Sequence, residues 1–522
     1  MTIKFEYDGL PIIKTTSGEL KGYKYDGIYT YKGIPYAHAK RWQMAKLSSW
    51  EGIFDATNYG RVAPLMMQDN PKGEMKCPHM YWPQDEDCLS LNIWTKDLES
   101  KKPVMVWIHG GGYFAGSSIE QLAYDGANIA KEDCVCVSLN HRLNIFGFLD
   151  LEPFGEKYKN SANAGLDDIV KALIWIRDNI EAFGGDKDNI TLFGQSGGGM
   201  KISLLMQTPA AEGLFHKAIM MSGIGGNFMP PYPKENGDGT LIVTKMLEKL
   251  GLTVDDIDQL ETMPYQQVFM AYGQAMSEVA KMGGYVGNNP RIDDYCLGEG
   301  NLTEFTQQSK KTPLLIGSVF GEFGGFMPLP FNKHETPDEV VKVMLQERFN
   351  DNTDEIISLF KKAYPNNALA DLLVIDTLFR PLNNQFTKDK AALKEAPVYN
   401  YLFNVDFPFD GGSAAWHCSD IPYFFGNIDK APYTSSISYA KKLQSEMFGA
   451  FLAFARTGNP NHDGMSQWDP STQTEVKTMI FGQDSHQEIN HDEKLISKLK
   501  ETLPELTAEM LLASMNDTNI QH

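Results

Sequence analysis

Asn189-Ile190-Thr191-Leu192-Phe193-Gly194-Gln195-Ser196-Gly197-Gly198-Gly199-Met200 is the stretch on which the interpretation of this chain depends. A short run with strand character breaks at Gly194, and apolar sequence of helical character begins at Met200. Ser196 stands at the centre of a G-x-S-x-G motif, a tight strand-to-helix turn that pushes the serine oxygen outward. The turn needs its glycines because it leaves no room for Cβ atoms. The motif predicts a nucleophilic serine, although a chain with 46 glycines also produces it by chance.

A second glycine cluster, His109-Gly110-Gly111-Gly112, follows the nearly continuous apolar run 103–108. A run of this length and composition is typical of a strand that is buried on both faces. Consecutive glycines let backbone N–H groups face a reacting carbonyl oxygen with no side chain in the way. A flexible turn would have the same sequence, but the position upstream of Ser196 favours an oxyanion hole.

The order of the predicted elements indicates the fold class. Strands alternate with an amphipathic helix over 163–183 and the apolar segment that follows the serine. This alternation predicts an α/β protein with a central, mostly parallel twisted sheet and helices on both faces. We expect a single domain over residues 1–522, with helical insertions at about 230–303 and 336–387 that form a cap or regulatory region beside the site. The predicted strands are 20–25, 28–37, 89–94, 103–108, 134–139, 190–193, 218–222, 314–319 and 398–403.

Composition and charge narrow the possible partners. A formal net charge of -20 argues against nucleic acid, which requires a basic face to neutralise phosphates. The N-terminus has no signal-peptide pattern, and no later stretch reaches the ~20 apolar residues of a membrane span. These features predict a cytoplasmic protein with no membrane span that acts on a small molecule.

The six cysteines are too few and too scattered for a disulfide scaffold. Cys134 and Cys136 alternate on a predicted buried strand, where packing is a more common role than metal binding. Cys77 and Cys88 are close enough in sequence to form a bridge, and the sequence leaves that question open. No metal ligand set is predicted.

A serine hydroxyl becomes a strong nucleophile only when an imidazole takes its proton and a carboxylate holds that imidazole. In folds with this turn the chain order is serine, acid, histidine. Among the downstream histidines, His417 follows a predicted buried strand and has aromatic neighbours. Glu322 follows the strand 314–319 at the edge where ligands gather, and a solvated glutamate is an equally good interpretation of it. Asp420 is the rival acid, three residues from His417.

The motifs together resemble the type-B carboxylesterase/lipase family, the cholinesterase-like branch of the α/β-hydrolases, and its bacterial-type carboxylesterases. The resemblance covers nearly the whole chain and keeps the motifs in order. They are Gly33 to Ala37, Glu86 to Asn92, His109 to Gly112, Asn140 to Arg142, Phe183 to Asp186, Gly194 to Gly198 and Arg456 to Asn461.

The resemblance implies a role for individual residues of this chain. It implies Ser196 as nucleophile, Glu322 as acid and His417 as base. It also implies that Gly111, Gly112 and Gly197 donate the oxyanion-hole hydrogen bonds, that Ser222 supports the acid, and that Arg41 and Glu86 form a structural ion pair. Two residues depart from the family pattern: Gly197 stands where alanine is usual, and Phe323 follows the acid where glycine is common. We expect the resulting run of three glycines to hold the turn less rigidly.

These residues predict hydrolysis of a carboxylic ester through an acyl-enzyme, with no metal or organic cofactor, by a monomer or homodimer. Two alternatives stay open at this point. The same triad serves amidases and lipases, and some relatives in the family are non-catalytic adhesion or binding proteins.

Overall fold

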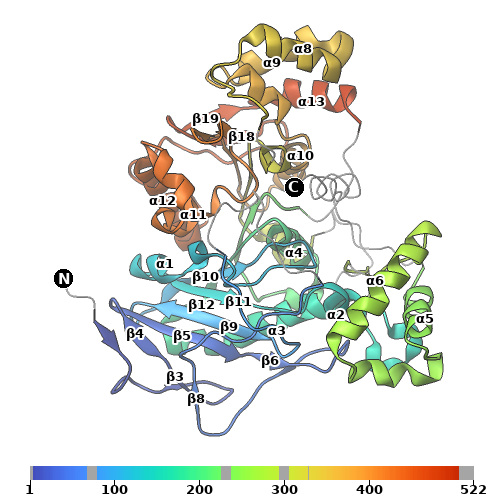
Figure 1. Ribbon diagram of the computed structural model, residues 1–522. Helices are drawn as coiled ribbons and strands as arrows, with labels where there is room; N and C mark the ends of the chain where they lie inside the picture. The colour runs from blue at the N-terminus through green and yellow to red at the C-terminus, as the bar shows by residue number, and fades with distance from the viewer. Residues whose placement is uncertain are drawn as a thin grey trace.

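The computed structural model describes residues 4–66, 79–224, 237–287, 289–292, 305–326 and 329–504. A twisted twelve-stranded sheet runs through the described chain (Figure 1). Its strands are, in spatial order, β1 (Phe5–Glu6), β4 (Tyr23–Tyr25), β5 (Ile28–Pro35), β9 (Ser90–Thr95), β11 (Val135–Leu139), β10 (Lys102–Ile108), β12 (Gly185–Gln195), β13 (Lys217–Met221), β14 (Leu314–Val319), β15 (Val398–Phe403), β18 (Lys477–Phe481) and β19 (His486–Ile489).

The central block of the sheet, from β11 to β18, is parallel, and the strands outside it pair antiparallel. Every strand predicted from the sequence is present, whereas β1, β18 and β19 of this sheet were not predicted. Parallel strands bring their carboxyl ends to one edge of the sheet. The residues that follow β10, β12, β14 and β15 therefore meet at one edge, and all of the candidate site residues belong to these segments or to the turn after β13.

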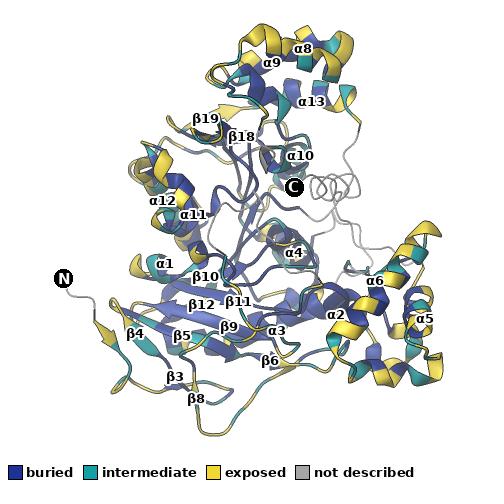
Figure 2. Cartoon of the chain, in the orientation of Figure 1, coloured by how far each residue is buried: buried dark blue, intermediate teal, exposed yellow. Residues whose placement is uncertain are grey.

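Both faces of the central block are buried. On β10, Met105 and Trp107 belong to one core, whereas Val104, Val106 and Ile108 belong to the core on the opposite face. Helices α1 (Ala127–Lys131), α11 (Ile421–Phe425) and α12 (Ala440–Thr457) cover the first face, and α3 (Ala164–Asn179) and α4 (Gly197–Leu205) cover the other. Figure 2 shows the central strands buried along their length. This is the α/β-hydrolase arrangement expected from the sequence.

The two segments expected to be insertions are helical where they are described. Within 230–303, α5 (Thr240–Lys249) and α6 (Tyr265–Lys281) pack with α2 (Asn144–Phe148) around a separate small core. Within 336–387, α8 (Asp338–Phe349) and α9 (Thr353–Ala363) lie with α13 (Glu493–Thr502) at the top of Figure 1.

The helix α10 (Phe379–Ala392) begins inside the second of these ranges but packs directly on β14 and β15. Its first residue reaches the candidate site. The division of the chain into one domain with two insertions stays a prediction.

Three smaller expectations can be compared with the structure. Arg41 and Glu86 form the expected ion pair, with 2.6 Å between Nε and Oε2. Cys88, Cys134 and Cys136 are buried free thiols, and Cys77 lies outside the described residues. None of the helices in the described ranges combines the length and apolar character needed to cross a membrane.

Candidate active site

Ser196 lies in the sharp turn between β12 and α4, with φ 54° and ψ -124°. A positive φ is costly for a residue with a Cβ and persists only where the surrounding structure imposes it. The Ser196 N–H donates to Met221 O at 2.8 Å, which ties the turn to β13. The structure therefore holds this serine in a strained backbone conformation at the carboxyl edge of the sheet.

The glycines around Ser196 are required by close backbone contacts. A Cβ on Gly198 would lie 2.0 Å from Ile108 O, and one on Gly194 would lie 2.7 Å from the carbonyl carbon of Gly198. Gly223 has the same constraint, because its Cβ would lie 2.0 Å from Ser196 O. The sequence-based explanation of the G-x-S-x-G glycines is confirmed by these distances.

The loop after β10 turns back sharply at Gly111 and Gly112, whose φ values are 84° and 61°. Gly111 O accepts hydrogen bonds from the N–H groups of Phe114 and Ala115, at 3.2 and 3.0 Å. Within the described part of the chain, the N–H groups of Gly111 and Gly112 donate to no partner. The N–H of Gly197, at the first position of α4, also has no intrahelical acceptor. Three unused backbone donors thus border the turn.

Gly197 and Gly112 touch backbone to backbone. A Cβ on Gly197 would lie 2.2 Å from Gly112 O and 2.5 Å from Gly112 N. The expectation that the run of three glycines holds the turn less rigidly stays a prediction, and the glycine loop occupies the space in which an alanine methyl group would lie. Gly197 brings the two loops into close contact.

Glu322 and His417 form a buried pair, with 2.5 Å between Glu322 Oε2 and His417 Nδ1. The other carboxylate oxygen, Oε1, accepts the N–H of Val319 at 2.8 Å. The two loops are also joined through their backbones. His417 N–H donates to Glu322 O at 3.1 Å, and Gly321 N–H donates to Ala415 O at 2.8 Å. The side-chain contact is thus fixed by the loops that carry it.

The electrostatic setting of Glu322 is dominated by burial. Burial raises the pKa of Glu322 to about 8, while the Ser222 hydroxyl and the Val319 N–H favour its ionised form. Ser222 is buried at φ 45° next to this carboxylate, although its hydroxyl makes no well-formed hydrogen bond there. Asp376 is a second buried carboxylate, whose pKa is raised to about 7 by burial and by the charge of Glu322.

Asp420, the rival acid, does not bind His417. Its Oδ2 accepts a hydrogen bond from Tyr401 Oη at 2.8 Å, and burial raises its pKa to about 7. Its charge interacts with Glu322 and His417 only at longer range. The geometry therefore favours Glu322 as the carboxylate that orients the imidazole.

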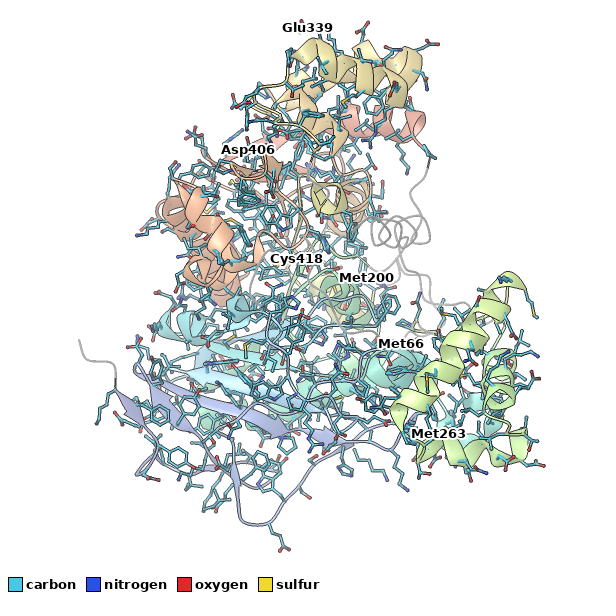
Figure 3. All side chains as sticks on the ribbon, viewed as in Figure 1. Met66, Met200, Met263, Glu339, Asp406 and Cys418 are labelled. Carbon is cyan, nitrogen blue, oxygen red and sulfur yellow. The ribbon has the colours of Figure 1, made fainter. Side chains whose placement is uncertain are left out.

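Gln195 is a contact of His417 that the sequence analysis did not identify. Its Nε2 lies 3.1 Å from His417 Nε2 and 3.4 Å from Nδ1, and its Oε1 accepts the Cys418 thiol at 3.2 Å. The Ser196 hydroxyl and the His417 ring share no hydrogen bond in the described chain, a common situation in enzymes without bound substrate. Cys418 marks this region in Figure 3, at the centre of the molecule. The position of Gln195, directly before the motif serine, could have identified it.

Two phenylalanines pack on the His417 ring. The centroid of Phe323 lies 4.6 Å from it at an interplanar angle of 32°, and that of Phe379 lies 5.5 Å away at 16°. The two phenylalanine rings are only 5.7 Å apart, too close for rings on opposite faces of the imidazole. They therefore pack on one side of it, and Phe323, the second departure from the family pattern, forms part of this packing.

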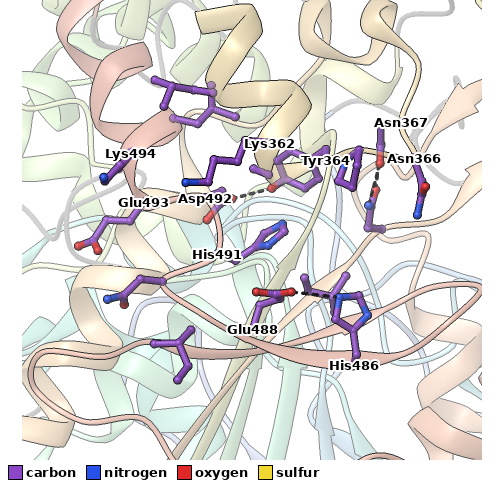
Figure 4. Close-up of a pocket in the computed structure, with 18 residues that line it drawn as sticks. Lys362, Tyr364, Asn366, Asn367, His486, Glu488, His491, Asp492, Glu493 and Lys494 are labelled. Atoms are coloured by element: carbon purple, nitrogen blue, oxygen red, sulfur yellow. Dashed lines mark hydrogen bonds and ion pairs between the residues drawn. The ribbon is translucent and has the colours of Figure 1, made fainter. Parts of the chain in front are cut away.

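A hollow of about 550 Å³ lies elsewhere, between α9, β19 and α13 (Figure 4). Tyr364, His491 and Asp492 are among its lining residues, and none of the candidate site residues is. The Tyr364 hydroxyl donates to Asp492 at 2.6 Å, and Asp492 also binds Arg380. Tyr364 and Asp492 thus serve structural contacts.

Comparison with known proteins gives the family. A model of the Carboxylesterase family matches residues 9–497. The chain belongs to the carboxylesterase family. It is a carboxylic ester hydrolase with the α/β-hydrolase fold.

Several carboxylesterase relatives match almost the full chain. Para-nitrobenzyl esterase of Bacillus subtilis is 33% identical over 92% of this chain and 96% of its own length. Phenmedipham hydrolase of Pseudarthrobacter oxydans is 32% identical over 90% of this chain and 95% of its own. A solved esterase from Clostridium hathewayi, described as able to hydrolyse aliphatic aromatic polyesters, is 47% identical, with a TM-score of 0.92 over 96% of this chain and 100% of that one.

The contact between Gly197 and Gly112 gives a first prediction. Gly197→Ala should lower kcat/KM because the methyl group forces the two loops apart and displaces the backbone donors, with the ~10²–10³ cost of losing one oxyanion-hole donor as the upper limit. Steady-state kinetics of ester turnover measure the change in kcat/KM, and thermal unfolding shows whether the variant is folded. Gly273→Ala in α6 is the control, since its Cβ meets no atom within 4 Å. Wild-type kcat/KM in Gly197→Ala would contradict the prediction.

The two buried acids give a second prediction. Glu322→Gln should lower kcat by about 10⁴, because an amide cannot hold and stabilise the imidazolium as a carboxylate does. Asp420→Asn should keep most of the activity, because the partner of Asp420 is Tyr401. Steady-state kinetics of the two variants compare them. A larger loss in Asp420→Asn would reverse the assignment.

Proposed function

We propose that this carboxylesterase acts through a serine nucleophile, Ser196, with His417 as general base and Glu322 as the acid that orients it. The observation that supports the proposal most is the buried Glu322–His417 pair at the sheet edge that carries the strained Ser196 turn. The order serine, acid, histidine along the chain agrees with the family pattern. We propose Gly111, Gly112 and Gly197 as the oxyanion donors.

The proposed reaction begins when Ser196 Oγ attacks the ester carbonyl and His417 Nε2 takes the hydroxyl proton. Glu322, at His417 Nδ1, stabilises the imidazolium that forms. The oxyanion accepts hydrogen bonds from the three glycine N–H groups. His417 then returns the proton to the departing alcohol, and water releases the acyl group by the same steps. No step requires a metal or an organic cofactor.

Gln195 has a defined part in this proposal. Its amide now lies against the His417 nitrogen that must receive the proton. Before reaction the Gln195 amide must move away from His417 Nε2, so that the serine hydroxyl can bind there. The amide can stay near the ring, because its Oε1 accepts a hydrogen bond from the Cys418 thiol. Ser222, behind Glu322, favours the ionised acid.

The wider setting of the enzyme is also a proposal. We propose a cytoplasmic monomer or homodimer whose substrate is a small carboxylic ester. The four free thiols among the described cysteines support a reducing compartment, and the charge of -20 disfavours nucleic acid as a partner. The activity described for the clostridial relative adds an aliphatic aromatic polyester to the substrates worth assaying.

Turnover of a chromogenic short-chain ester tests the proposal. The wild type should hydrolyse it, and Ser196→Ala should lose nearly all activity because the nucleophile is gone. Ser203→Ala is the matched control, a buried serine on α4 whose hydroxyl donates to Met200 O at 2.7 Å. Substantial turnover by Ser196→Ala, or none by the wild type, would refute the assignment.

A further inference from the structure

Lys201 is a completely buried lysine on α4, behind the Ser196 turn. A buried ammonium is costly unless it is paired, so its retention requires an explanation. Its Nζ donates one hydrogen bond, to His109 O at 3.3 Å. That carbonyl stands at the end of β10, where the glycine loop begins.

The carbonyl oxygens of His109, Gly110 and Gly111 each have a hydrogen-bonding partner. Lys201 Nζ holds His109 O, the His109 ring nitrogen Nδ1 lies 2.9 Å from Gly110 O, and the Phe114 and Ala115 N–H groups hold Gly111 O. In a planar trans peptide the C=O and the following N–H point in opposite directions. Holding Gly110 O and Gly111 O therefore aims the N–H groups of Gly111 and Gly112 away from these anchors.

Lys201 also acts on the anchor beside it. Burial and the charge of Lys201 keep the pKa of His109 well below its ordinary value, so the ring stays neutral. Burial and the charge of Lys201 also keep the pKa of His141 well below its ordinary value. The His141 ring stacks on His109, with ring centroids 4.9 Å apart. The positive charge beneath the loop thus resides on Lys201.

The charged and titratable groups around Lys201 are few. Glu120 is the carboxylate whose charge favours the ammonium, and His109 and His141 are the facing imidazoles. Arg142, beside His141, is paired with Asp168 at 2.7 Å. A Cβ on Gly116 would lie 2.7 Å from His109 Nδ1 and 3.3 Å from Glu120 Oε2, so that the ring and the carboxylate share the space left by this glycine.

We propose that Lys201 is a positioning residue for the oxyanion hole, whose ammonium anchors the glycine loop and strengthens its hydrogen bonds to the developing oxyanion. The inference rests on the proposed function of Ser196. Lys201 does not touch the substrate and acts through the backbone of residues 109–111.

The proposal has a pH signature. Burial lowers the pKa of Lys201 to about 7, so the ammonium is present below that value and is lost as the pH rises through it. The contribution of Lys201 should therefore be largest in acid and should fade in alkaline solution. Comparison of a variant with the wild type at each pH cancels the titration of His417, which both share.

The test compares Lys201→Met with the wild type from pH 6 to pH 9. At pH 6, kcat/KM for a short-chain ester should fall about tenfold with little change in KM, the scale of one charge-assisted hydrogen bond. The affinity for a trifluoromethyl ketone, which binds as an oxyanion, should fall by a similar factor. The ratio of wild type to variant should approach one at pH 9.

Folding and remote effects need separate controls. Replacing a buried charge by an apolar side chain of similar volume should leave Tm unchanged or higher. Lys390→Met is the matched control, because Lys390 is another buried lysine bound to one carbonyl, Lys310 O at 2.7 Å. It should behave as the wild type at every pH.

Glu120→Gln tests the same proposal without truncating Lys201. Loss of the neighbouring carboxylate should move the alkaline decline of kcat/KM about one pH unit lower. The role of Lys201 would be overturned by a ratio of wild-type to Lys201→Met kcat/KM that is near one at pH 6, or that stays tenfold through pH 9. It would also be overturned by an equal loss of kcat/KM in Lys390→Met, or by an alkaline decline of kcat/KM that does not move in Glu120→Gln. An active wild type and an inactive Ser196→Ala would leave the proposed function standing in all of these cases.

Discussion

The backbone contact between Gly112 and Gly197 is the constraint on which the site depends. It joins the loop after β10 to the turn after β12, and these strands are parallel neighbours in which Ile108 pairs with Gly194. Gly197 cannot acquire a side chain without separating the two loops, whereas a Cβ on Gly112 would meet the Phe114 ring of its own loop. The same sheet edge receives the loops that carry Glu322 and His417. A few unusually close backbone contacts therefore bring together segments that are far apart along the chain.

Burial gives these groups their chemistry. Glu322, Asp376 and Asp420 are all buried, and burial raises the pKa of each. On the other side of the Ser196 turn the buried Lys201 has its pKa lowered for the same reason. Charges in such an environment interact more strongly than they do in water, since little solvent screens them.

Much of this arrangement could be predicted from the sequence. The glycine motifs indicated where β10 and β12 end, and apolar runs located β13, β14 and β15, so the fold and the candidates Ser196 and His417 followed. The choice of Glu322 over a solvated glutamate needed the resemblance to the family. The edge strand β19 was missed because its sequence carries little apolar pattern, and β18, which lies between β15 and β19, was missed because its apolar run covers only Met479 to Phe481. Gln195, Phe379 and Lys201 were missed because their roles depend on where side chains point after folding. Lys201 did leave a signal, a charged residue inside an otherwise apolar helix.

In the proposed mechanism, Ser196 carries the acyl group between the two halves of the reaction. The enzyme is mixed briefly with a slowly hydrolysed ester and quenched with acid. Mass spectrometry and peptide mapping then locate the acyl group directly. A single acyl adduct is expected on the peptide that contains Ser196, and no adduct is expected in Ser196→Ala. An adduct on any other residue, or turnover with no adduct under conditions that trap it, would contradict the account.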